Sequence, residues 1–307
     1  MTDFMGKTLS NPIIASSCIE TENVRNVLRL IRNGVQGIIL KSCADYKRSG
    51  TSDKRQFAVD KNGFVYASSP FENEILTLEE CLDMLSKLRK KTDILLIPSF
   101  TASCLEPDAW LEPCKKLVRN GADGIQLDFF YMGNLIGTDN FSKRLSALLC
   151  ELVNGLDVPV MPKLNVNLPK DFIMPVLVST GVEYVSLLDS VRSPYLEEHN
   201  GKYSVSERLD SQTTSCFGHW QLPLTLGYTY TAAQYGLKVC AGGGVTSADD
   251  VRKLLAAGAV TVQSASFLTK YPDKVFELYP DISTETLPPK GGSVSVRCVA
   301  GQPKGFA

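Results

Sequence analysis

The sequence is poor in histidine and contains no closely paired cysteines. Its two histidines, His199 and His219, argue against a histidine-based metal site and against a Ser-His-Asp triad. None of the nine cysteines belongs to a CxxC pair, which argues against a zinc ribbon or an iron–sulfur cluster. Their odd number and wide scatter predict reduced thiols. We therefore predict no metal site, and electrons would have to leave through a small molecule or another protein.

Long runs of one charge and long apolar runs are also absent. The formal net charge is -1, and the densest basic stretch, residues 86–92, suits a solvated helix end, so no nucleic-acid partner is expected. No apolar stretch of about 20 residues occurs, and the polar first residues do not resemble a cleavable signal sequence. These absences predict a cytoplasmic protein with no membrane partner.

One local pattern recurs along the chain: a helix end, a glycine and then a strand. It occurs at residues 33–41, 120–128, 180–188 and 257–265, and the glycine suits a left-handed helix cap. Between these copies lie four further apolar strands, at residues 11–15, 93–99, 160–163 and 238–241. Each strand precedes a segment of helical periodicity, such as residues 24–33 or 249–257.

The strands have continuous rather than alternating apolar runs, as expected for parallel strands that helices cover. Eight such units predict an α/β fold, a single (β/α)8 TIM barrel over residues 1–286; a doubly wound sheet is the alternative. Insertions at residues 42–75 and 189–221 follow strands two and six, where barrel enzymes place substrate loops. The tail, residues 287–307, has no helical periodicity and is expected to be extended or bound to a partner.

The glycine-rich stretch at residues 239–268 is the most informative part of the chain. Gly242, Gly243 and Gly244 follow one strand, a helix covers residues 247–257, and Ala265 and Ser266 follow the next strand. Small residues after two consecutive barrel strands are typical of a phosphate site, because backbone amides can approach an anion closely there. The alternative is an ordinary tight turn.

Two lysines, Lys41 and Lys163, stand at the ends of apolar strands, where a buried ammonium needs an anionic partner. They could form structural ion pairs with Asp128 and Asp189, which end neighbouring strands. One of them could instead be the Schiff-base lysine of a lyase or aldolase. A third reading is a cofactor that develops negative charge, such as a reduced flavin.

The order of these motifs resembles the dihydroorotate dehydrogenase superfamily over roughly residues 4–270. Residues 9–17 resemble its opening strand, residues 41–42 and 161–164 its two flavin lysines, and residues 216–226 its glycine turn, with His219 in place of the next glycine. The resemblance implies FMN as cofactor, a homodimer, and hydride transfer at flavin N5. It assigns cofactor binding to Ala15, Ser16, Lys41, Lys163, Gly218, Gly243, Gly244, Ala265 and Ser266.

The substrate side departs from the family pattern. The segment 128–134 lacks the catalytic cysteine or serine, and Tyr131 stands near the expected place of the base. Asp189-Ser190 replaces the family's Asn-Ser/Thr pair; ionised aspartate only accepts hydrogen bonds, whereas asparagine also donates. Asp128 and Asp189 would therefore oppose the orotate anion, and a substrate with donors, such as an amine, is expected. Alternatively, each aspartate neutralises a lysine.

These assignments predict Lys41, Tyr131 and Lys163 as catalytic residues. Tyr131 would protonate a substrate carbon during reduction, or it would simply pack over the C-terminal end of the barrel. Cys18 and Cys43 are also expected near that end. Substrate binding is predicted for Asp128, Asn134, Asp189 and Ser190.

The predicted function is therefore an FMN-dependent oxidoreductase acting on a small molecule other than orotate. The alternatives are a true dihydroorotate dehydrogenase of pyrimidine biosynthesis, a Schiff-base lyase or aldolase, and a non-catalytic barrel acting as a binding subunit.

Overall fold

The computed structural model describes residues 1–46, 56–68, 75–129, 140–207, 209 and 214–279. Eight parallel strands form a closed barrel, because the first barrel strand pairs with both the second and the last. This closure confirms the predicted (β/α)8 TIM barrel and excludes the doubly wound sheet. The barrel strands are β3 (Ile13–Ala15), β4 (Gly37–Ala44), β8 (Leu95–Thr101), β9 (Ile125–Asp128), β10 (Val160–Lys163), β11 (Tyr184–Leu187), β16 (Lys238–Ala241) and β17 (Ala259–Ser264).

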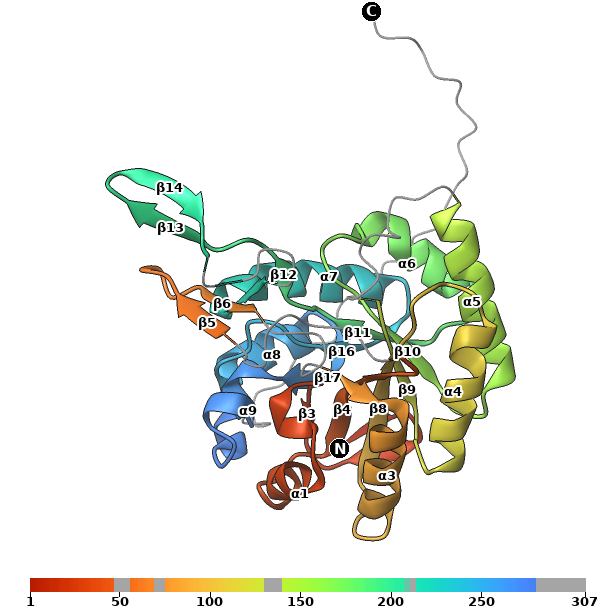
Figure 1. Ribbon diagram of the computed structural model, residues 1–307. Coiled ribbons are helices and arrows are strands. Elements are labelled where there is room, and N and C mark those ends of the chain that lie inside the picture. Colours follow the sequence, from red (N-terminus) through yellow and green to blue (C-terminus); the bar gives the residue numbers. More distant parts are fainter. Residues whose placement is uncertain (47–55, 69–74, 130–139, 208, 210–213, 280–307) are drawn as a thin grey trace, which may run out of the picture.

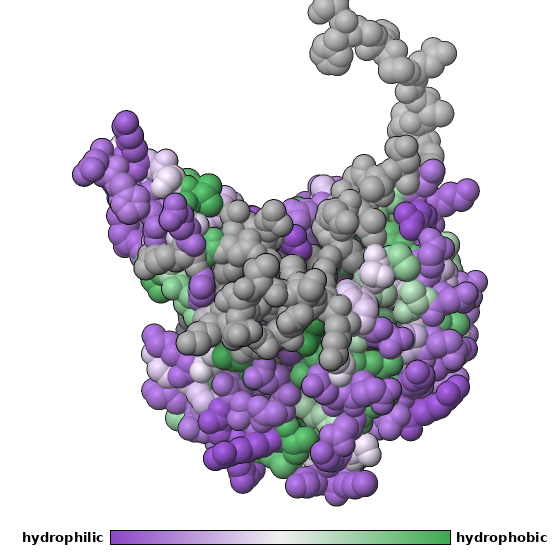
Figure 2. All heavy atoms as spheres, in the orientation of Figure 1, coloured by the Kyte–Doolittle hydropathy of each residue, from purple (hydrophilic) through white to green (hydrophobic). Residues whose placement is uncertain are grey.

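Helices surround the barrel on its outside (Figure 1). Several begin at a side-chain cap: Asn23, Thr77 and Ser247 each accept a hydrogen bond from a backbone amide of the first turn. On the face in Figure 2, hydrophilic residues dominate the outer surface of the barrel. The helices are α1 (Val24–Arg32), α3 (Leu78–Arg89), α4 (Asp108–Arg119), α5 (Phe141–Gly155), α6 (Lys170–Ser179), α7 (Leu222–Gln234), α8 (Ala248–Ala256) and α9 (Ser266–Lys270), with short 3-10 turns η1 (Ile19–Thr21), η3 (His219–Gln221) and η4 (Val275–Leu278).

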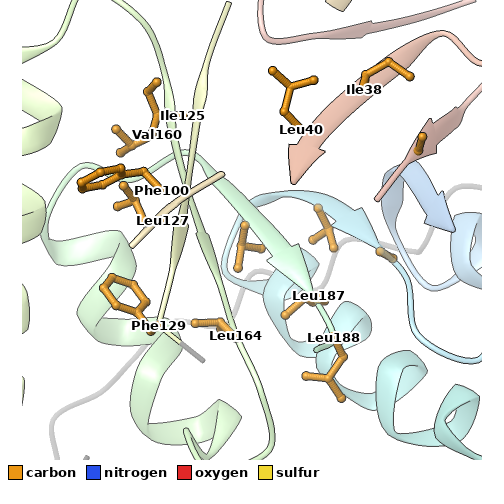
Figure 3. Packing of buried hydrophobic residues seen from close by; sticks show 14 of the residues in the cluster. Ile38, Leu40, Phe100, Ile125, Leu127, Phe129, Val160, Leu164, Leu187 and Leu188 are labelled. Atoms are coloured by element: carbon orange, nitrogen blue, oxygen red, sulfur yellow. The ribbon is translucent and has the colours of Figure 1, made fainter. Parts of the chain in front are cut away.

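The barrel strands are buried on both faces, and alternate residues serve two cores. One core lies between strands and helices and includes Ile38, Leu40 and Phe100; Figure 3 shows part of this packing. The other lies inside the barrel, where Ile14 and Ile39 meet residues of the neighbouring strands. This double burial explains why the apolar runs in the sequence are continuous.

A short hairpin of β1 (Thr2–Phe4) and β2 (Lys7–Leu9) lies at the N-terminal end of the barrel. Its Phe4, Met5 and Leu9 join the inner core, and Phe4 meets the Tyr184 ring edge-on at 5.1 Å. Apolar side chains therefore close this end of the barrel, and the cavity lies at the opposite end.

The two insertions meet each other above the C-terminal ends of the strands. From the first insertion come β5 (Gln56–Val59) and β6 (Val65–Ser68), and from the second come β12 (Val191–Arg192) and β15 (Ser215–Phe217). They form one sheet in the order β12-β15-β6-β5. The sequence placed both insertions at this end but gave no sign that they pair.

Three further short strands lie just after the first insertion or within the second. The short strand β7 (Leu76–Thr77) pairs with β4. A hairpin of β13 (Leu196–His199) and β14 (Lys202–Val205) stands away from the barrel (Figure 1). The predicted tail at residues 287–307 lies outside the described residues. Within the described part of the chain, every helix is too short or too polar to cross a bilayer.

Candidate active site

A cavity of about 460 Å³ lies at the C-terminal ends of the barrel strands. This volume falls in the usual range of about 300–1,000 Å³ for small-molecule and cofactor sites. Ends of strands around the barrel form its floor, and Phe57, Val65, Ala67 and Phe217 of the insertion sheet form part of its wall. The site is therefore built from barrel ends below and from both insertions above.

The glycine loop after β16 forms one end of the cavity, and its conformation requires glycine. Gly243 and Gly244 have φ angles of +99° and +85°, which residues with a Cβ rarely adopt. A Cβ on Gly244 would lie 2.5 Å from the Leu222 amide nitrogen, and one on Gly242 would lie 2.4 Å from the Gln263 side chain. The loop thus packs closely against both α7 and β17, which explains three consecutive glycines.

Within the described residues, the carbonyls of this loop accept hydrogen bonds from the protein, whereas the amides of Gly243 to Val245 donate none. The Gly242 carbonyl accepts from the Leu188 amide, and the Gly243 carbonyl accepts from Thr225 Oγ1 at 2.9 Å. Among the described residues, none accepts a hydrogen bond from the amides of Gly243, Gly244 or Val245, and all three residues line the cavity. Three consecutive free N–H groups at a cavity form an anion-binding concavity.

The loop after β17 adds further donors beside the glycine loop. Ala265 and Ser266 line the cavity, and their amides bind no acceptor in the described part of the chain. The Ser264 hydroxyl is buried and has no hydrogen-bond partner among the described residues.

The opposite part of the cavity carries charged side chains. Lys41 and Ser42 both line it although they are neighbours on β4. Adjacent strand residues normally point to opposite faces, but the pairing of β4 with β8 shifts register between Leu40 and Cys43. Such irregularities re-aim side chains near active sites, and here the shift lets both residues reach the mouth.

Lys163 forms a buried ion pair with Asp189. Its Nζ lies 2.8 Å from Asp189 Oδ2, and the two side chains are 10% and 15% exposed. Burial lowers the pKa of the Lys163 ammonium, but the carboxylates of Asp189 and Asp128 outweigh burial and leave that pKa raised. Burial raises the pKa of the Asp189 carboxyl, against the attraction of Lys163. This pair bears out the ion-pair alternative for Lys163 and Asp189.

Asp128 ends a chain of hydrogen bonds that runs across three strands. Gln126 Nε2 donates to Ser99 Oγ at 2.9 Å, and Ser42 Oγ lies 3.0 Å from Ser99 Oγ and donates to Asp128 Oδ2 at 2.7 Å. Because the Ser42 proton goes to the carboxylate, the Ser99 proton must go to Ser42. All donors of this chain therefore point toward Asp128, whose carboxylate accepts the last of these hydrogen bonds.

Sequence reasoning missed Gln263, which lies on β17 and lines the cavity. Its Oε1 accepts from Ser16 Oγ at 2.9 Å, and its Nε2 donates to Ser186 Oγ at 2.8 Å. Its Nε2 also lies 2.8 Å from the Leu187 carbonyl. This glutamine links the ends of β3, β11 and β17 under the cavity. A glutamine within a mostly buried strand was the sequence signal for it.

Most of the predicted site residues meet at this cavity. Ala15 does not line it, because it is fully buried in β3. Tyr131 and Asn134 lie outside the described residues. The predicted residues that line the cavity are Ser16, Lys41, Asp128, Lys163, Asp189, Ser190, Gly218, Gly243, Gly244, Ala265 and Ser266.

The two cysteines expected near the mouth differ in position. Cys18 lines the cavity, and burial raises the pKa of its thiol. Cys43 is fully buried and does not line the cavity; a hydrogen bond with Cys81, together with burial, raises its pKa well above the usual range. Neither environment favours a thiolate. The described residues contain no cluster of three or more histidine, cysteine or acidic side chains that could hold a metal ion.

Comparisons with known proteins support the fold alone. No protein-family model matches the chain, and no curated protein is similar to it in sequence. Among solved structures, the chain is similar to dihydroorotate dehydrogenase (DHODH) from Eimeria tenella, crystallised in complex with ferulenol. The sequences are 14% identical, and the similarity covers 90% of this chain and 81% of that one with a TM-score of 0.71. The chain therefore has a DHODH-like TIM-barrel fold, as its motif order suggested.

Proposed function

We propose that the protein is an FMN-dependent oxidoreductase that transfers hydride between flavin N5 and a small molecule other than orotate. The observation that carries the proposal is the glycine loop at the cavity: its carbonyls accept hydrogen bonds from the protein, while its amides have no acceptor among the described residues. Lys41 and Lys163 line the same cavity. The DHODH-like fold supports the same class of cofactor.

The residues present fit FMN at both ends of the cavity. The amides of Gly243, Gly244 and Val245, which have no acceptor among the described residues, offer donors to a phosphate. A Cβ on Gly243 or Gly244 would collide with protein atoms packed against the loop, so this loop path requires glycine. Bound FMN would supply the hydride chemistry. Within the protein, Lys163 keeps a positive charge at the cavity, which favours negative charge on a bound ring, and Asp189 holds the ammonium in place.

The substrate end of the cavity carries carboxylates where an orotate site would need donors. The Asp128 carboxylate accepts at the end of a chain of hydrogen bonds. Asp189 places a second carboxylate at this end, paired with Lys163. A substrate that donates hydrogen bonds, such as an amine, suits these acceptors. Robust dihydroorotate oxidation by the purified protein would contradict this part of the proposal.

The environment of Lys163 argues against the Schiff-base alternative at that lysine. An amine must lose its proton before it attacks a carbonyl, and Schiff-base lysines have lowered pKa values. The pKa of Lys163 is raised, because its carboxylate neighbours outweigh its burial. Borohydride should therefore trap no carbonyl substrate on Lys163.

The proposed role of Tyr131 stays a prediction: Tyr131→Phe should keep flavin binding and lower turnover. The homodimer also stays a prediction.

The deciding experiment is an absorption spectrum of the desalted protein, followed by heat release and identification of the chromophore. Flavin bands and release of about one FMN per chain are expected. Protein purified without flavin should take up added FMN and bind riboflavin more weakly, because riboflavin lacks the phosphate. A colourless protein that takes up no FMN would overturn the proposal.

A further inference from the structure

His219 lies behind the glycine loop, on the side away from the cavity. It follows Gly218 and begins η3, just before α7. Its side chain is 60% exposed, and it is not among the residues that line the cavity. Its Nδ1 lies 2.9 Å from the Gly244 carbonyl oxygen. The carbonyl of the last glycine of the loop is therefore held by a side chain outside the cavity.

The surrounding hydrogen bonds determine which ring nitrogen carries the proton. A carbonyl oxygen only accepts, so Nδ1 of His219 must donate to Gly244. Thr246 Oγ1 lies 3.2 Å from the same nitrogen and donates its own proton to Asp250 Oδ2 at 2.9 Å. It can thus accept from Nδ1 but not donate to it. The buried Asp250 carboxylate, 3.6 Å from Nδ1, also favours a proton there.

This contact orients the next amide of the loop. In a trans peptide the C=O and the following N–H point in opposite directions. The Gly244 carbonyl points to His219, away from the cavity, so the Val245 N–H points toward the cavity that Val245 lines. That amide has no acceptor among the described residues.

We infer that His219 is a positioning residue for anion binding, which fixes the Gly244–Val245 peptide so that the Val245 amide donates to the ligand's phosphate. The inference rests on the proposed function for the identity of that ligand. It makes His219 Nδ1–H, rather than the size or charge of the ring, the feature that binding requires. Asp250 and Thr246 act behind it by favouring the Nδ1–H form.

Two variants separate the hydrogen bond from the bulk of the side chain. His219→Asn keeps a donor nitrogen bonded to Cγ, as Nδ1 is, whereas His219→Leu keeps a similar size without a donor. His199→Leu is the control, because His199 lies on the exposed hairpin strand β13. FMN affinity should fall about tenfold in His219→Leu, the value of roughly one hydrogen bond, and stay near wild type in His219→Asn and His199→Leu. Riboflavin affinity should be the same in all four proteins.

A second measurement tests the geometry without flavin. The sequence has only two histidines, so the histidine region of a long-range ¹H–¹⁵N NMR spectrum should contain two sets of signals. The set that remains in His199→Leu belongs to His219. We expect it to show the Nδ1–H tautomer. The inference fails if His219 carries its proton on Nε2, if His219→Leu binds FMN as wild type does, or if that variant loses FMN and riboflavin equally. If the wild type binds neither flavin, the proposed cofactor is wrong. The positioning role of His219 is then tested by its tautomer and by the NMR chemical-shift change of the Val245 amide on adding inorganic phosphate.

Discussion

The two ends of the cavity bind by different means. At the glycine loop, the groups that face a ligand are backbone amides, and side chains such as Thr225 and His219 act from behind. At the lysine end, the groups are charged side chains that already have partners, as Lys163 has in Asp189. The glycine-loop end offers backbone N–H groups that have no acceptor among the described residues. The lysine end offers charged side chains that are already paired within the protein.

This difference predicts different consequences of substitution. A site made of backbone depends on a particular chain path, so any added Cβ should block it without changing its charge. A site made of buried charges tolerates changes of shape but not the removal of one partner, because the other charge then remains buried alone. Substitutions at each end can therefore test whether the cavity is divided in this way.

The largest expected effect is that of Gly244→Ala. The new Cβ would lie 2.5 Å from the Leu222 amide nitrogen, at a φ of +85°. The loop must therefore move, and its free amides should lose their common direction. FMN affinity should fall by about a hundredfold or more, as expected when several hydrogen bonds are lost together. A fluorescence titration with FMN measures this loss.

Gly236→Ala is the control for Gly244→Ala. Its φ is +78°, so the backbone strain is comparable, but a Cβ there meets nothing within 4 Å. This variant should lose some stability and keep its FMN affinity. Equal loss of FMN affinity in both variants would mean that general destabilisation, and not the cradle, explains the result.

The second effect should appear at the charged end, in Asp189→Asn. Removing one partner of a buried ion pair typically costs about 3 kcal/mol of unfolding free energy. The buried setting of Lys163 and Asp189 supports a value of that order. Urea unfolding of Asp189→Asn, Lys163→Met and the double variant forms a thermodynamic cycle. The double variant should be less destabilised than the sum of the two single variants; simple additivity would show that the two charges do not interact.

The sequence was informative about the backbone end for a physical reason. Few residue types other than glycine adopt the required φ, so the need for Gly243 and Gly244 is visible in the residues themselves. The same holds for the strands: β10 and β16 have the predicted bounds, residues 160–163 and 238–241. Local chemistry determines these features, and a sequence records local chemistry.

The charged end depends on contacts between distant segments, and those were predicted less well. Lys41 and Lys163 were found as anomalies in apolar strands, but the choice between ion pair and free charge needed the partner's position. The shifted register of β4, which runs on to Ala44, has no sequence signal because every residue of that strand is buried. The pairing of β6 with β15 joins two insertions more than a hundred residues apart in the chain.

A smaller effect is expected for Ser42→Ala. The substitution removes the hydroxyl that donates to Asp128 Oδ2 at 2.7 Å, and a hydrogen bond to a charged group contributes about 1.5–3 kcal/mol. Ser99→Ala is the matched variant, because Ser99 lies one step further from the carboxylate. Thermal or urea unfolding should rank Ser42→Ala as more destabilised than Ser99→Ala. The reverse order would show that the chain of donors does not serve Asp128.

The smallest effect is a pH dependence that belongs to the charged end alone. Because its carboxylate neighbours raise the pKa of Lys163 in the folded state, folding holds that proton more firmly than the unfolded chain, where a lysine has a pKa of about 10.4. The stabilisation is therefore complete below that value and is lost as the pH rises through the higher folded pKa. The difference in unfolding free energy between wild type and Lys163→Met should stay constant from neutral pH to about 10 and then shrink. Lys90→Met, at the exposed end of α3, controls for the loss of a lysine. If the difference in unfolding free energy grew with pH instead, burial would lower the pKa of Lys163 more than Asp189 raises it. A Schiff-base role for Lys163 would then be possible again.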